Sequence, residues 1–208
     1  LARRIDGLDA EHIVFCGVHF MAETAAILAR PGQKVHIPDE DASCVMADMV
    51  PAALAEKVLA ALNRDGARII PLTYVNSSAA VKAVCGRHGG SVCTSANAKT
   101  MMKWALGQGD GVLFMPDANL GRNTAHALGI DPARTLRLDV RGQGRHVAAA
   151  DPATSIYHWP GLCAVAWPEA EMPRGAMRED GTVGVLELVA VLGDEVRYGT
   201  AAAAARAA

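Results

Sequence analysis

The sequence predicts an α/β protein in which parallel-sheet layers are flanked by helices. Short apolar runs alternate with helical segments up to about Leu138, and polar residues follow several of the runs where each one ends. Of the 208 residues, 51% are hydrophobic and 20% are charged, which is typical of a globular rather than a disordered chain. This length allows one or two domains with a sizeable core.

The first expected elements are a strand at 12–16, a helix at 21–28 and a strand at 34–37. A Pro-Gly pair stops the helix, and a proline closes the second strand. A polar loop at 39–43 then leads to Cys44.

A helix is expected over 51–62, because a proline at its first position needs no N–H donor there. The next strand, at 68–74, contains Pro71, which cannot donate to a neighbouring strand. We therefore expect this strand to lie near a sheet edge or a bulge. The polar residues 76–78 can cap a helix at 79–85.

The rest of the α/β pattern extends to about residue 138, and the sequence is loop-like from Val140 onward. Either Ser95 or Asn97 can cap the helix that follows the strand expected at 91–93. The remaining expected elements are a strand at 91–93, a helix ending at 106, a strand at 111–115, a helix near 120–128 and an extended segment at 134–138.

Charge and composition exclude several classes of function. Twenty basic and 22 acidic residues give a net charge of −2, so no overall positive field favours nucleic acid. No apolar run approaches the roughly 20 residues that span a bilayer, so no membrane association is expected. Dinucleotide, nucleotide triphosphate and serine-hydrolase motifs are absent. The five cysteines form no CxxC pair, and their odd number favours a reducing, cytoplasmic location.

Polar loops follow the expected strands at their carboxyl ends, where ligands bind in parallel α/β sheets. Free N–H groups at helix starts suit phosphate or carboxylate. The alternative is that these residues only cap helices. The loops are 39–44, 73–78, 93–97 and 116–119.

Tyr74 follows an apolar strand, so its phenol can point into the crevice formed by these loops. A phenol there can move a proton or donate to a developing oxyanion. The alternative is a core tyrosine whose hydroxyl has a partner.

The cysteines divide by their surroundings. Cys44 and Cys163 lie in loops, and loop thiols directed at a crevice can ligate iron. Cys16, inside an expected strand, and Cys85, at a helix end, are interpreted as buried structural residues. Cys93 lies beside a cap motif, where its sulfur can simply pack.

Several motifs in order resemble the quinolinate synthase family, from about Ile13 to Val165. A succession of motifs is far more specific than any one of them. The runs are CGVHFMAETAAIL at 16–28, IPD and ASCVMA within 37–47, YVNSS at 74–78, CTSANA at 93–98, FMPD and NLGRNTA within 114–125, and WPGLCAV at 159–165.

The resemblance implies three similar α/β domains around a pseudo-threefold axis, with a [4Fe–4S] cluster bound by one cysteine from each. It also implies the condensation of iminoaspartate with dihydroxyacetone phosphate to quinolinate, for NAD biosynthesis. An L-aspartate-oxidising enzyme that supplies iminoaspartate is an implied partner. The matching site residues are Cys44 and Cys163 as metal ligands, Tyr74, Val75, Asn76 and Ser95 as substrate contacts, and Tyr74 also as the proton shuttle.

By this resemblance, residues 1–46 are the last part of a first domain, 47–163 a complete second domain, and 164–208 a divergent tail. The family's opening segment is missing before Leu1, and Ala166 stands where the family has a histidine. No third cluster cysteine follows Cys163, so we expect a fragment or a reading-frame change, with little or no activity. Two alternatives stay open: an iron-free α/β protein that binds phosphate or dicarboxylate ligands, and a structural or interaction domain.

Overall fold

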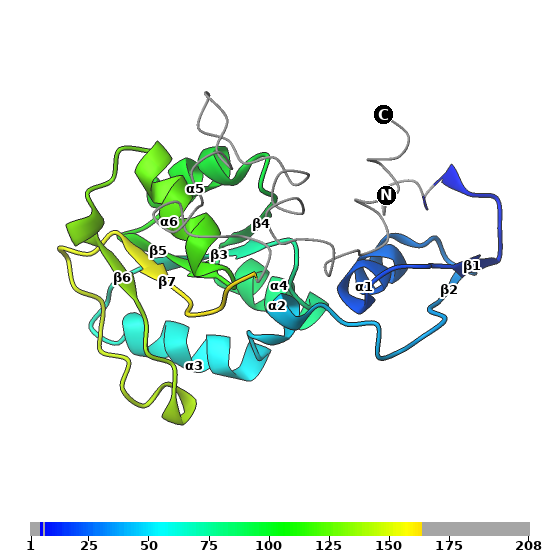
Figure 1. Ribbon diagram of the computed structural model, residues 1–208, viewed down its shortest axis with the longest axis horizontal. Coiled ribbons are helices and arrows are strands. Elements are labelled where there is room, and N and C mark those ends of the chain that lie inside the picture. Colours follow the sequence, from blue (N-terminus) through cyan, green and yellow to red (C-terminus); the bar gives the residue numbers. More distant parts are fainter. Residues whose placement is uncertain (1–4, 6, 164–208) are drawn as a thin grey trace, which may run out of the picture. The chain divides into compact units, whose positions relative to one another are not determined.

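Two parallel sheets organise the part of the chain that the structure describes (Figure 1). The computed structural model describes residue 5 and residues 7–163, which all belong to one compact unit, Leu1–Cys163. The divergent tail expected at 164–208 lies outside the described residues.

The smaller sheet pairs β1 (His12–Val14) with β2 (Lys34–His36) in parallel. Helix α1 (His19–Leu28) connects the two strands. Its Ala22 and Ala25 pack in one apolar cluster with residues such as Ile13. The expectation that Cys16 is a buried strand residue is wrong, because β1 ends at Val14 and the Cys16 side chain is exposed.

The larger sheet has five parallel strands, so the α/β class with parallel sheets flanked by helices is confirmed. One strand of this sheet, at 156–158, was not expected from the sequence, and it lies between two strands that come earlier in the chain. In spatial order the strands are β4 (Ser91–Cys93), β3 (Ile69–Tyr74), β5 (Gly111–Met115), β7 (Ile156–His158) and β6 (Thr135–Arg137).

Helices cover both faces of this sheet, with α3 (Ala52–Leu62) and α4 (Ala79–Arg87) on one face. Helices α5 (Ala98–Leu106) and α6 (Ala118–Ala127) cover the other, as Figure 1 shows for α3 against α5 and α6. Because side chains alternate along a strand, Leu113 of β5 packs toward the α3 layer while Phe114 packs toward α5. Every residue of β5 is buried, as expected for a strand covered on both faces.

Pro71 was expected to place its strand near a sheet edge or a bulge, and β3 lies directly beside the edge strand β4. Strand β3 is paired on both sides, and Pro71 lies in register with Leu113 of β5. Its carbonyl faces Gly90, where an added Cβ would lie only 1.9 Å from the Pro71 oxygen. In a strand, the N–H and the C=O of one residue point to the same side, so the side of Pro71 that lacks an N–H is the side that faces Gly90. Gly90 directly precedes β4, which begins at Ser91. The missing donor therefore removes no hydrogen bond to β5.

The helix starts agree with the capping expectations in part. The Ser78 side chain accepts a hydrogen bond from the Val81 N–H and so caps α4. Asn97 stands at the N-cap of α5, but its side chain accepts instead from the Thr94 N–H and hydroxyl group. Two short 3₁₀ turns, Pro132–Arg134 and Gly142–Gly144, and a one-turn helix α2 (Val45–Asp48) complete the described elements.

Helix α1 contacts the start of α4 through polar side chains. The Glu23 carboxylate accepts from the Ala79 N–H at 2.8 Å, and the Lys82 ammonium donates to the Thr24 hydroxyl at 3.2 Å. A carboxylate at a helix N-terminus is stabilised by the helix dipole. The domain boundary expected at residue 46 stays a prediction. In the described part of the chain, no helix is both long and apolar enough to cross a membrane.

Candidate functional site

Strand β3 ends in Tyr74, whose half-buried side chain lies at the carboxyl edge of the larger sheet. Burial raises the pKa of the Tyr74 phenol, and a side-chain hydrogen bond with Ser95 opposes this rise. Negative charge on Cys163 or on Asp117 raises this pKa further. Two predicted site residues, Tyr74 and Ser95, are therefore in direct contact, and Cys163 acts electrostatically on the same phenol.

The next two predicted site residues extend from the same strand end. The Val75 N–H donates to the Cys93 carbonyl at 2.8 Å, so the main chain here continues the pairing of β3 with β4. The Asn76 amide nitrogen lies 3.9 Å from the Cys44 sulfur, in weak hydrogen-bond contact. The end of β3 thus contacts one of the two cysteines predicted to bind metal.

Cys44 lies at the N-cap of α2, and Met49 lies at the C-cap of the same helix. The Met49 carbonyl accepts from the Trp159 indole N–H at 2.8 Å, and the Met49 sulfur accepts from the Leu162 N–H at 3.4 Å. The segments that carry Cys44 and Cys163 are therefore joined through Met49, although 119 positions separate the two cysteines in the sequence.

A cavity of about 240 Å³ lies beside Cys44. It opens between the start of α1, the loop before α2 and the residue that caps α4. Tyr74 and Cys163 do not line it. Its lining residues are His19, Phe20, Glu40, Ser43, Cys44, Ala47, Asp48 and Ser78.

Sequence reasoning placed Asp117 in a strand-end loop but did not select it as a site residue. Its side chain is only 3% exposed, and burial raises the pKa of its carboxyl group. Hydrogen bonds from the N–H groups of Asn119, Leu120 and Cys163 oppose this rise. The sequence signal that could have found it is an acidic residue two positions after a fully apolar strand, because a carboxylate that is buried there needs hydrogen-bond partners.

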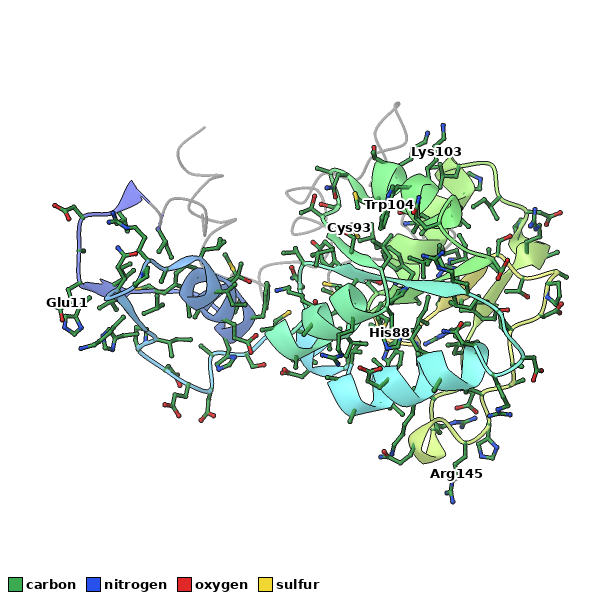
Figure 2. The ribbon with its side chains drawn as sticks, turned by 180° about the vertical axis from the view of Figure 1, so that it is seen from behind. Glu11, His88, Cys93, Lys103, Trp104 and Arg145 are labelled. Atoms are coloured by element: carbon green, nitrogen blue, oxygen red, sulfur yellow. The ribbon has the colours of Figure 1, made fainter. Side chains whose placement is uncertain are left out.

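The thiols differ in their suitability for iron. Burial raises the pKa of Cys85 and of Cys93 to about 12, so both remain protonated at neutral pH. Figure 2 labels Cys93, which packs in the apolar cluster under α5. Cys44 and Cys163 are only partly buried, which suits ligands to a bound group.

The described residues provide only some of the ligands that an iron–sulfur cluster needs. Two partly exposed thiols, Cys44 and Cys163, have the donor chemistry that iron in such clusters prefers. Among the residues that the structure describes, no three histidine, cysteine or acidic side chains gather around one metal position.

The fold and the residues at this sheet edge show the general class of the protein. It is an α/β protein whose parallel strands present tyrosine, amide, hydroxyl and thiol groups at their carboxyl ends, where such proteins bind ligands. The family model described as quinolinate synthetase A protein matches residues 1–168. The chain therefore belongs to the quinolinate synthase family, as its motifs predicted.

Individual relatives agree with this assignment. The chain is 49% identical over 158 residues to a quinolinate synthase of Geobacillus kaustophilus and 55% identical over 158 residues to that of Geobacillus thermodenitrificans. It is 44% identical over 161 residues to the quinolinate synthase of Acidobacterium capsulatum. Each match covers 76% of this chain and 43% of the relative, so the chain spans less than half the length of these relatives.

Proposed function

We propose that this chain carries part of a quinolinate-forming site, which condenses iminoaspartate with dihydroxyacetone phosphate in NAD biosynthesis. The observation that carries this proposal is the convergence at the end of β3. Asn76 contacts Cys44 there, while Ser95 and Cys163 act on Tyr74. Membership of the quinolinate synthase family supports it.

In this proposal Tyr74 is the proton shuttle, and Val75, Asn76 and Ser95 contact the substrates. The Tyr74 phenol, whose pKa is raised, is protonated at neutral pH and can donate a hydrogen bond to a developing oxyanion. Ser95 orients the phenol through their side-chain hydrogen bond. The Asn76 amide is a further donor for a carboxylate or carbonyl oxygen.

Cys44 and Cys163 would supply two of the three thiolates that hold a [4Fe–4S] cluster. When bound, such a cluster supplies an open iron that acts as a Lewis acid toward a substrate carboxylate or hydroxyl group. Of the remaining cysteines, Cys85 and Cys93 are buried, and among the described residues no group of three metal-binding side chains includes Cys16. The 208-residue chain alone is therefore expected to have little or no activity. The implied source of iminoaspartate is an L-aspartate-oxidising enzyme in the same cytoplasmic compartment.

Anaerobic reconstitution with iron and sulfide tests this proposal. The expected product is brown, with visible absorption that is lost in Cys44→Ser and in Cys163→Ser. Cys16→Ser is the matched control, because Cys16 is an exposed thiol in the loop after β1 of the smaller sheet, and it should retain the colour. A colourless wild-type protein, or equal loss in all three variants, would contradict the proposal.

A second candidate is an iron-free α/β protein that binds small phosphate or dicarboxylate ligands. It is favoured by the lack of three convergent metal ligands among the described residues. Calorimetry with inorganic phosphate and with succinate, on protein free of iron, tests it. Binding that is weakened in Asn76→Ala but unchanged in Cys163→Ser would support this candidate. The absence of binding to either ligand would leave only a structural or interaction domain as the alternative to the iron-dependent enzyme.

A further inference from the structure

Asp117 lies between the larger sheet and the segment that carries Cys163. It is the N-cap of α6, and its Oδ1 accepts from the Asn119 N–H at 2.9 Å. The same carboxylate also accepts from the N–H groups of Leu120 and Cys163. Two of these donors belong to the helix that Asp117 caps, but the third comes from 46 positions further along the chain.

The main chain reinforces this link. Asp117 and Gly161 form an isolated parallel bridge, and the Ala118 N–H donates to the Gly161 carbonyl at 2.9 Å. A Cβ at Gly161 would lie 2.6 Å from the Pro116 carbonyl oxygen, so the approach of the two segments requires glycine. The Cys163 segment is thus attached to the end of β5 by both main-chain and side-chain bonds.

The Asp117 carboxylate is also close enough to Tyr74 to act on its phenol electrostatically. One buried carboxylate therefore bonds to the main chain of a predicted metal ligand and lies near the predicted proton shuttle. A capping role alone does not explain this arrangement. Asp131 caps a turn through the Ala133 N–H at 2.9 Å, and Asp151 caps another through the Ala153 N–H at 2.8 Å, yet both are exposed.

We infer that Asp117 is a positioning residue that holds the Cys163 main chain beside Tyr74 and so fixes where the Cys163 thiol is presented. This inference deepens the proposed function and rests on it for the role of the thiol. The hydrogen bond itself can be tested without iron.

The decisive variant is Asp117→Ser in the full chain. Serine is a good N-cap, so the Asn119 N–H keeps its acceptor, but its side chain is too short to reach Cys163 as well. Amide hydrogen exchange by NMR should show the Cys163 N–H exchanging at least ten times faster than in the wild type. The Asn119 N–H should change less than threefold. Asp131→Ser is the matched control, and it should leave the Cys163 amide unchanged.

The second measurement is iron bound per chain after anaerobic reconstitution. Asp117→Ser should retain less than half of the wild-type iron, with weaker visible absorption. Asp117→Asn, which keeps the length and one accepting oxygen, should retain more iron than the serine variant. Since the asparagine variant also preserves the cap, it still reports if the serine variant does not fold.

The outcomes separate the two ideas. An unchanged Cys163 exchange rate in Asp117→Ser overturns the inference, as does an equal change in Asp131→Ser. Faster Cys163 exchange with reduced iron supports it. If exchange changes as expected while even the wild-type protein binds no iron, Asp117 still positions the segment, and the proposed iron-dependent function is what fails.

Discussion

The indole N–H of Trp159 donates to the Met49 carbonyl at 2.8 Å, and this bond joins two segments separated by 110 residues. Trp159 is 1% exposed, so its indole N–H has little access to water as an alternative acceptor. Met49 ends the short helix that Cys44 begins, and Trp159 lies four residues before Cys163. The bond therefore sets the relative placement of the two loops that carry the predicted metal ligands.

Trp159→Phe tests the energetic weight of this bond. It removes the hydrogen bond to Met49 and leaves space where the larger indole was buried, so the free energy of unfolding should fall by ~1–3 kcal/mol. Urea unfolding measures the change. Trp104→Phe on α5 is the control: the Trp104 side chain is 38% exposed, so its replacement should alter stability by less than ~0.5 kcal/mol.

Because His158 is buried, we expect the free energy of unfolding of the protein to fall in mild acid. The His158 side chain is 4% exposed, and neither ring nitrogen has a hydrogen-bond partner within the described residues. Burial, helped by the charge of Arg122, lowers its pKa from 6.5 to about 4. Because the unfolded chain takes up the proton more readily, stability is complete above pH 6.5 and falls as the pH drops toward 4. The maximum loss is ~3 kcal/mol.

Urea unfolding of the wild type and of His158→Leu, at pH 7 and at pH 4.5, checks this linkage. The difference between the two pH values should shrink by ~2 kcal/mol in the variant, since leucine has no proton to gain. His126→Leu, which removes an exposed histidine of α6, should keep the wild-type difference. An equal pH response in wild type and His158→Leu would show that other groups cause the acid sensitivity.

At Gly121 in α6, we expect that a substitution by alanine lowers the stability of the protein, which is unusual inside a helix. A Cβ there would lie 2.6 Å from the His158 Nδ1 and 2.8 Å from a Phe114 ring carbon. Gly121→Ala should therefore destabilise the protein by ~1–3 kcal/mol through overpacking, although alanine is the better helix former. Gly86 in α4 has no such neighbour within 4 Å, so Gly86→Ala should stabilise by ~0.5–1 kcal/mol. Thermal unfolding of both variants is the measurement. A lower unfolding temperature for Gly121→Ala alone would show that the close contact of α6 with the sheet requires glycine at this position.

Alkylation of the native, metal-free protein should distinguish the reactive cysteines from the unreactive ones. Cys85 and Cys93 are buried, and the pKa of each thiol is raised to about 12, so neither forms the reactive thiolate at pH 8. Treatment with iodoacetamide should label Cys16, Cys44 and Cys163, and mass spectrometry should find three additions per chain. Labelling of Cys85 under native conditions would mean that the α4 layer opens readily.

Most of the α/β pattern could be predicted from local sequence, because long apolar strands and helix breakers carry their own signals. The strand expected at 111–115 coincides with β5, and the cap expected before α4 is made by Ser78. Strand β7 was missed because three residues in a loop-like region show no periodicity. Its partners, β5 and β6, lie far from it in the sequence, and only the folded sheet brings them together.

The candidate site was predictable mainly through the family motifs. Contacts such as that of Asn76 with Cys44 depend on tertiary structure and have no local sequence signal. Asp117 illustrates the limit. Its position after β5 suggested a cap, but its bond to the Cys163 N–H depends on how residues 159–163 return to the sheet.

The position of β7 has a consequence for how the chain is made. Among the residues that the structure describes, β6 pairs with β7 alone, and β5 would otherwise present an open edge on that side. A ribosome-bound chain that stops before residue 156 therefore exposes two unsatisfied strand edges, and such edges favour aggregation. Once β7 is made, it pairs with β5 on one side and with β6 on the other. The thiol of Cys163, five residues further on, thus reaches its neighbours after the rest of the edge has formed.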